Sequence, residues 1–185
     1  MLPGFTNTID LMLAFRNGES IAFDHLFNKY YKAIFYFVFK IVKDDLAAED
    51  IATDGFIKLW EKKETITTEA SLRSYLYKTV YNFSLKWIGR NRRKDKVYHL
   101  YLQQNPDYEK DFFLTLVQSE TLRQLNEAID ELPNECRKVF TKLFVEGKNV
   151  NDAASELNIA VSTVKNQKAR GIKLLRQKLT FFIPL

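Results

Sequence analysis

Apolar residues recur every three or four positions along almost the whole chain, and this spacing constrains the fold most strongly. It places one apolar side chain on the same helix face at every turn. Glycine and proline, which interrupt helices, are few, since the 185 residues include six glycines and four prolines. The sequence therefore predicts an all-α protein, and its length allows two small helical domains, each with a modest core.

The periodicity also predicts where the helices lie. In the N-terminal half, a long aromatic-rich helix begins at Ser20, a second runs from about Asp45 to Glu61, and a third starts near Ser71 after a polar loop at 61–70. The two acids at 44–45 suit the positive end of a helix dipole. These three helices predict a three- or four-helix bundle in residues 1–96.

A polar patch at 103–107 then predicts a break between two domains, because it contains a proline and no apolar residue. We expect a flexible linker at 97–118 and a second domain at 119–185. That domain should contain helices at about 119–131 and 134–146, the latter with Phe144 facing inward, opened by Pro133 and stopped by Gly147. A helix-turn-helix should follow at 150–178.

Several chemistries find no support in the sequence. The single Cys136 excludes an internal disulfide and fits a reducing compartment. His25 and His99 are far apart, no metal-ligand spacing occurs, and no glycine-rich phosphate loop exists. The first ten residues have no secretory pattern, and the apolar stretch 33–39 is too short to span a bilayer. We expect a cytoplasmic protein that is not an enzyme, with no catalytic residue, metal, cofactor or small-molecule substrate.

Positive charge is concentrated in two clusters. Residues 86–96 contain six basic side chains and one acid, and residues 162–185 contain six and none, whereas residues 97–161 contain eleven acids and six bases. Clustered Lys and Arg favour a polyanionic partner, since each neutralised phosphate releases counterions. A solvated helix face is the other interpretation of either cluster.

The helix at 45–61 has two distinct faces. Spacing of 100° per residue brings Ala48, Ile51, Ala52, Gly55, Phe56 and Leu59 together as a core face. We call the opposite side the outer face; it consists of Leu46, Asp50, Thr53, Asp54, Ile57 and Glu61. Aliphatic residues among acids predict a docking surface for a basic partner, although scattered exposed apolar residues are also common on ordinary surfaces.

The helix-turn-helix carries the strongest local signal. Ala154 is small enough for two helices to cross, Asn158 tolerates left-handed geometry in the turn, and Val164 fills the space between the helices. Ser162 suits a position at or near the start of the second helix. That helix should enter the major groove of duplex DNA. Base edges are assigned to Ser162, Thr163, Lys165 and Asn166, and phosphates to Lys168, Arg170 and Lys173.

Together these segments resemble a known family. The sequences at 45–60 and 72–82 look like region two of extracytoplasmic-function sigma factors, and those at 129–140 and 150–175 look like region four. Thr163 to Asn166 read Thr-Val-Lys-Asn, which resembles the version common in Bacteroidetes. Gly55 stands where the family usually has a larger residue. The resemblance covers residues 19–179 in the family's order.

The resemblance implies a role for each part. Region two would dock its outer face on the clamp helices of the largest RNA polymerase subunit and open the minus-ten promoter element, whereas region four would read the minus-thirty-five element. Asn82 occupies the family's asparagine position at the minus-ten site. The minus-ten candidates are Lys62, Lys63, Arg73, Lys78, Asn82, Lys86, Arg90, Arg92 and Arg93. Implied partners are core RNA polymerase, including its flap region, promoter DNA, and an anti-sigma factor that is often membrane-anchored.

A repressor or response-regulator output is the alternative. Such a protein would use the C-terminal motif beside an unrelated helical sensor and would not bind core polymerase. It would explain the second basic cluster but neither the first cluster nor the mixed outer face.

Overall fold

A computed structural model describes residue 5, residues 7–91 and residues 108–179. All regular structure in these residues is helical, which confirms the predicted all-α fold. The chain divides into two compact units, Met1–Arg123 and Gln124–Leu185. None of the helices in the described part of the chain is long and apolar enough to cross a membrane.

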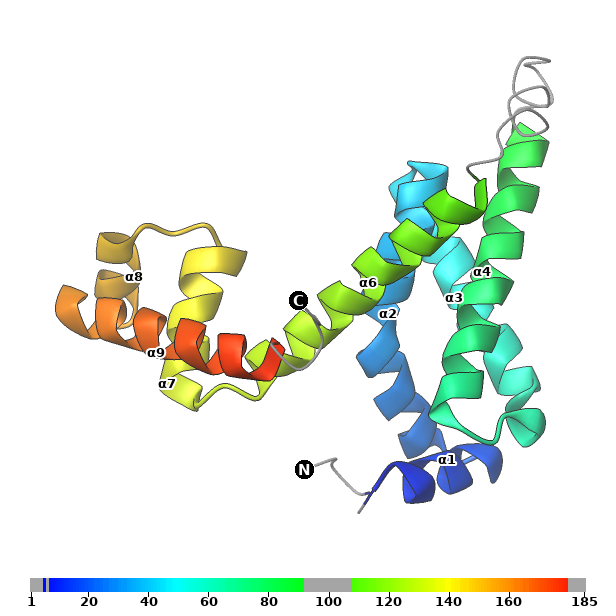
Figure 1. Cartoon of the computed structure of the whole chain (residues 1–185), viewed down its shortest axis with the longest axis horizontal. Helices are drawn as coiled ribbons and strands as arrows, with labels where there is room; N and C mark the ends of the chain where they lie inside the picture. The colour runs from blue at the N-terminus through cyan, green and yellow to red at the C-terminus, as the bar shows by residue number, and fades with distance from the viewer. Residues whose placement is uncertain (1–4, 6, 92–107, 180–185) are drawn as a thin grey trace. The chain divides into compact units, whose positions relative to one another are not determined.

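Three long helices form the first unit: α2 (Ser20–Val42), α3 (Asp45–Glu61) and α4 (Glu69–Asn91), which lie side by side in Figure 1. Asp44 caps α3 by accepting a hydrogen bond from the Ala47 amide at 2.8 Å. The core face predicted for this helix is buried as expected. A short 3-10 turn, Lys63–Thr65, occupies the loop before α4.

An additional helix, α1 (Thr8–Arg16), was not predicted and packs against α2. The side chain of Asn7 caps it by accepting from the Asp10 amide at 2.9 Å. Leu11, Met12 and Phe15 are buried on one side of it. The apolar spacing was present in the sequence, but it extends over too few turns to predict a helix from periodicity alone.

The helix α6 (Tyr108–Asp130) differs from the predicted organisation. Residues 97–107 of the expected linker lie outside the described residues, but residues 108–118 are helical. The reason is packing: Phe112 and Leu116 lie against the core of the first unit. The boundary between the two units therefore falls inside α6, after Arg123.

The second unit contains the end of α6, α7 (Asn134–Phe140), a π-helical turn (Thr141–Val145), α8 (Val150–Glu156) and α9 (Val161–Leu179). Pro133 precedes α7 as its N-cap, one position earlier than expected. The expectation that Phe144 faces inward is wrong, because its side chain is 53% exposed. The wider π-helical turn changes the direction of successive side chains, so the 3.6-residue spacing no longer holds there.

Candidate DNA and polymerase interfaces

The turn between α8 and α9 has the geometry that the sequence predicts. Asn158 adopts φ +53°, and the amide of Ile159 donates to the carbonyl of Ala154 at 3.0 Å. Ala154 and Val164 are buried where the two helices meet. The start of α9 is Val161, so Ser162 lies in its first turn and is not its cap. These observations confirm a helix-turn-helix.

Charged contacts hold α8 against the π-helical turn and the loop that precede it. The Glu156 carboxylate accepts hydrogen bonds from the ammonium groups of Lys142 at 2.8 Å and Lys148 at 2.9 Å. Hydrogen bonds from these two lysines hold the pKa of the Glu156 carboxyl below its ordinary value. The side chain of Asn149 caps α8 by accepting from the amides of Asn151 and Asp152. The first helix of the motif is therefore fixed independently of DNA.

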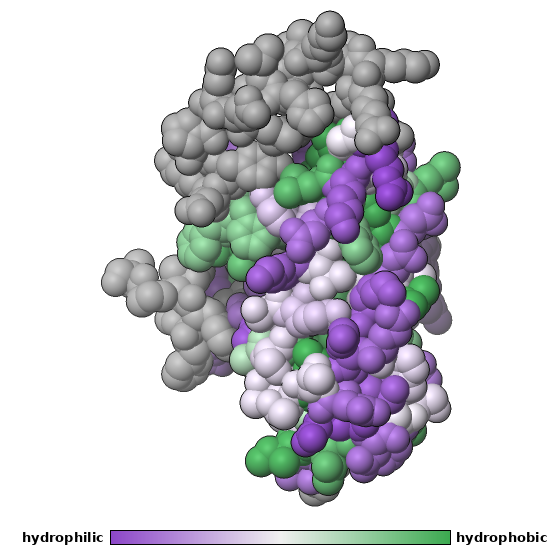
Figure 2. Space-filling view, turned by 90° about the vertical axis from the view of Figure 1, so that its right-hand side faces the viewer, coloured by the Kyte–Doolittle hydropathy of each residue, from purple (hydrophilic) through white to green (hydrophobic). Residues whose placement is uncertain are grey.

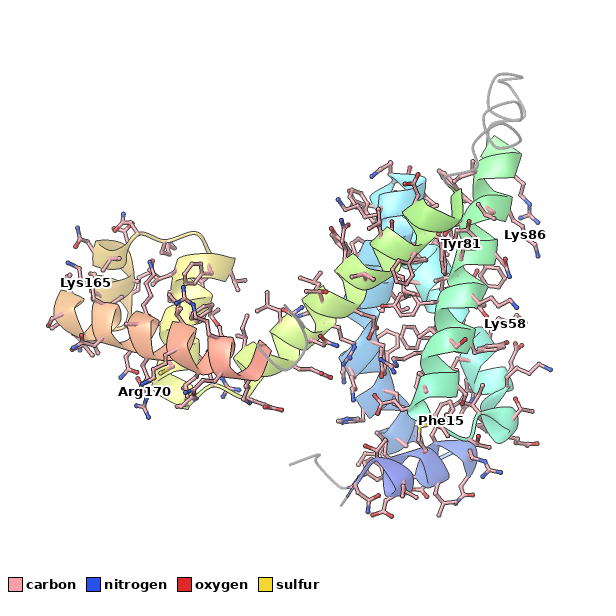
Figure 3. The ribbon with its side chains drawn as sticks, in the orientation of Figure 1. Phe15, Lys58, Tyr81, Lys86, Lys165 and Arg170 are labelled. Carbon is pink, nitrogen blue, oxygen red and sulfur yellow. The ribbon has the colours of Figure 1, made fainter. Side chains whose placement is uncertain are left out.

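Five of the seven candidate minus-thirty-five residues are exposed on α9. Ser162, Lys165, Asn166, Arg170 and Lys173 are exposed, whereas Thr163 and Lys168 are half-buried. Lys165 lies near the beginning of α9 and Arg170 projects farther along it (Figure 3). The inner side contains Val164 and Gly171, which are buried against the rest of the unit. A continuous cationic surface therefore begins at the N-terminal turn, as major-groove binding requires.

Two contacts on α9 were not foreseen from the sequence. The Cys136 thiol donates to Oε1 of Gln167 at 2.9 Å, so the lone cysteine anchors the inner side of α9. The Lys168 ammonium lies 5.4 Å from the ring centroid of Phe144. The exposed ring of Phe144 therefore supports a residue that was assigned to a phosphate. Both contacts join residues that are far apart in the sequence, so neither could be predicted before the fold was known.

The outer face of α3 is exposed throughout. Leu46 and Ile57 are 76% and 50% exposed, and the four polar members of the face are exposed as well. Lys58, which the sequence interpretation left out, lies beside the face and pairs with Glu61 at 2.6 Å. Figure 2 shows the side of the first unit that carries α3 and α4, where a band of hydrophilic side chains is interrupted by apolar ones. Two exposed aliphatic side chains among acids are consistent with a surface that docks on a partner.

The candidate minus-ten residues do not form one cluster. Arg73, Lys78 and Asn82 line a cavity of about 610 Å³ between α4 and α6. Lys86 and Arg90 are exposed elsewhere on α4; Lys86 points away from α6, whereas Tyr81 points toward it (Figure 3). Arg92 and Arg93 lie outside the described residues.

The remaining two minus-ten candidates, Lys62 and Lys63, lie in the loop before α4. Lys62 is exposed, but Lys63 is half-buried and its ammonium lies 4.7 Å from the ring centroid of Trp60. That contact orients Lys63 toward α3, and Lys63 is not among the residues that line the cavity beside α4. The described minus-ten candidates therefore lie in three places: in the cavity, on an exposed side of α4 and in the loop before α4.

The described residues contain no group of three or more His, Cys, Asp or Glu side chains that could hold a metal ion. The candidate DNA-binding residues offer cations, amides and hydroxyls, whereas the outer face of α3 offers carboxylates and aliphatic side chains. One helical unit carries a cationic helix-turn-helix and the other carries an exposed acidic face, a combination that is typical of a two-domain DNA-binding protein.

Comparison with known families gives the class a name. Residues 26–94 match the model for sigma-70 region 2, and residues 122–175 match the model for sigma-70 region 4. The chain therefore belongs to the sigma-70 family, in its extracytoplasmic-function group, and is a factor that directs RNA polymerase to promoters for transcription initiation. A repressor with an unrelated sensor domain is not favoured.

The chain is similar along most of its length to characterised members of that group. It is 26% identical to the ECF RNA polymerase sigma factor SigW of Bacillus subtilis over 178 residues, which covers 89% of this chain and 92% of SigW. It is 23% identical to SigX of the same organism, over 85% of this chain and 83% of SigX. Among solved structures, the sigma factor RpoE in complex with the anti-sigma factor NepR from Bartonella quintana matches with a TM-score of 0.35. That match has 17% identity and covers 87% of this chain and 98% of the RpoE chain.

Proposed function

We propose that the chain works through three surfaces: the outer face of α3 docks on core RNA polymerase, α4 and the loop before it open the minus-ten element, and α9 reads the minus-thirty-five element. The observation that carries this division is the separation of charge. The outer face is acidic with exposed aliphatic residues, whereas α9 carries six cations and no acid after Ser162.

Each surface suits its proposed partner. Leu46 and Ile57 supply apolar area, and Asp50 and Asp54 attract a basic surface such as the one we propose on the clamp helices of the largest polymerase subunit. On α9, Lys165 and Asn166 can pair with guanine and adenine edges in the major groove. We place the first two activities in residues 1–96, the last in 119–185, and a linker in the segment between, shortened by the helix that starts at Tyr108.

We further propose a cytoplasmic protein without catalytic activity, regulated by an anti-sigma factor that covers its polymerase- or DNA-binding surfaces. The flap region of polymerase would contact the second unit. The Thr-Val-Lys-Asn sequence at 163–166 supports a Bacteroidetes-like origin.

Polymerase affinity of a charge-reversal variant tests the docking surface. Asp54→Lys should weaken binding to purified core polymerase by about tenfold, because like charges then face each other across the interface. Asp24→Lys makes the same charge change at an exposed position of α2 outside the outer face and should bind normally. Equal affinities for the two variants, measured by fluorescence anisotropy with both chains folded, would remove the outer face from the proposal.

A further inference from the structure

The N-terminal half of α6 packs along the cavity side of α4. We call residues 112–123 of this helix the strap. The ring centroid of Phe112 lies 4.7 Å from that of Tyr81 and 5.6 Å from that of Phe37, in both cases edge to face. Leu116 packs against the same core. Aromatic and aliphatic contacts therefore hold one end of the strap on the first unit.

Charged groups hold the other end. The Glu120 carboxylate accepts from Nη1 of Arg73 at 3.3 Å, from the Tyr77 hydroxyl at 2.8 Å and from Nε of Arg123 at 3.1 Å. Arg123 is only 8% exposed, and its guanidinium lies 5.1 Å from the ring centroid of Tyr30. Burial, followed by the nearby Glu120 carboxylate, raises the pKa of Tyr77, so its hydroxyl keeps the proton that it donates.

This carboxylate occupies a place that suits a phosphate. The Arg73 guanidinium and the Tyr77 hydroxyl, both on α4, converge on this anion, whereas Arg123 belongs to the strap itself. Once the strap moves away, the two donors on α4 become available to a DNA phosphate. Arg73 is one of the proposed minus-ten residues, and Lys78 and Asn82 line the same cavity. The rings of Tyr77 and Tyr81, on which unstacked bases could lie, face the strap as well.

We infer that the strap and single-stranded DNA compete for this side of α4, so that the free protein keeps part of its minus-ten surface closed. The inference rests on the proposed role of α4. Binding of the strand would displace Glu120 from Arg73, and the strap would leave the aromatic rings. The apparent dissociation constant of the free chain is then the intrinsic constant divided by the fraction of molecules in which the strap is undocked.

Variants of the full chain that loosen the strap should bind single-stranded DNA more tightly. Glu120→Gln removes the charge that occupies Arg73, and we expect about fivefold tighter binding. Phe112→Ala removes the aromatic anchor, and we expect about tenfold tighter binding. The matched controls are Asp111→Asn, which removes an exposed charge from the same helix, and Phe113→Ala, whose ring is 61% exposed. Both should stay within about twofold of the natural chain.

The assay is fluorescence anisotropy with a short labelled single-stranded DNA of mixed sequence, together with hydrogen exchange of the amides in 112–123. Saturating DNA should increase exchange in the strap of the natural chain, and Phe112→Ala should show that increase without DNA. Equal DNA affinities for all five chains, or a strap that keeps full protection at saturation, would overturn the inference and leave the role of α4 intact. If neither loosened variant bound DNA, the inference and the proposed role of α4 would both fail.

Discussion

Gly55 lets α3 and α4 approach closely, and a methyl group at this position would collide with α4. A Cβ built on Gly55 would lie 2.4 Å from Cγ1 of Val80 and 3.5 Å from Cδ1 of Leu76. Carbon atoms in contact normally stay about 3.5–4.0 Å apart. Gly55→Ala therefore requires the two helices to separate by about 1 Å, or Val80 to leave its rotamer.

Two opposing terms set the size of the effect. Overpacking of a close contact costs about 1–3 kcal/mol. Alanine gains about 1 kcal/mol over glycine in a helix interior. We therefore expect Gly55→Ala to lower the free energy of unfolding of the first unit by about 1 kcal/mol. Gly89 of α4 is the matched control, because a Cβ there would meet nothing within 4 Å, and Gly89→Ala should stabilise the unit.

Urea denaturation followed by tryptophan fluorescence measures this difference. Trp60 and Trp87 are the two tryptophans of the sequence, and both lie in the first unit. Adding Val80→Ala to Gly55→Ala should recover part of the loss, since it removes the colliding methyl group. The reasoning is refuted if Gly55→Ala stabilises the chain as much as Gly89→Ala does.

Three further predictions concern both units. Lys165→Ala should change preference among promoter sequences, whereas Lys173→Ala should weaken binding to all of them and reduce its salt dependence; equal losses on every duplex in a salt titration would contradict this division. In the turn, Asn158→Ala should cost about 1 kcal/mol of stability and Asn158→Gly almost nothing, because φ is +53° there; equal melting temperatures would contradict this. Burial raises the pKa of the Glu69 carboxyl, but hydrogen bonds from Lys29 and Tyr30 outweigh it and leave the pKa below its ordinary 4.5. Glu69 should therefore stabilise the fold above that pH and lose its contribution as the pH falls below it. The measurement is an acid titration of the free energy of unfolding for the natural chain and for Glu69→Gln. The same pH dependence in both chains would be evidence against this pairing.

The sequence predicted the helices whose apolar spacing is long and regular. The two faces of α3 followed from 100° steps alone, since Ile51 and Phe56 are buried and Leu46 and Ile57 are exposed. The helix-turn-helix followed from the small Ala154 and from Asn158, because the turn restricts residue type as well as spacing. These features depend on neighbouring residues in the chain.

The features that were missed depend on contacts between distant residues. Residues 112–118 of the strap were predicted to be linker because a polar patch precedes them, and residues 119–123 were predicted to begin a helix of the second domain. Nothing local shows that Phe112 reaches Phe37 or that Glu120 reaches Arg73. The minus-ten candidates were selected by charge and resemblance, so their division between the cavity and the open side of α4 could not be foreseen. The π-helical turn that exposes Phe144 likewise breaks the periodicity on which the prediction relied.

Transcription by purified core RNA polymerase tests the central claim most directly. With this chain added, core polymerase should start transcripts from genomic DNA at a defined set of positions that share two spaced sequence elements, and without it those starts should disappear. If the chain failed to associate with core polymerase and bound duplex DNA tightly by itself, the account of a promoter-directing factor would be contradicted.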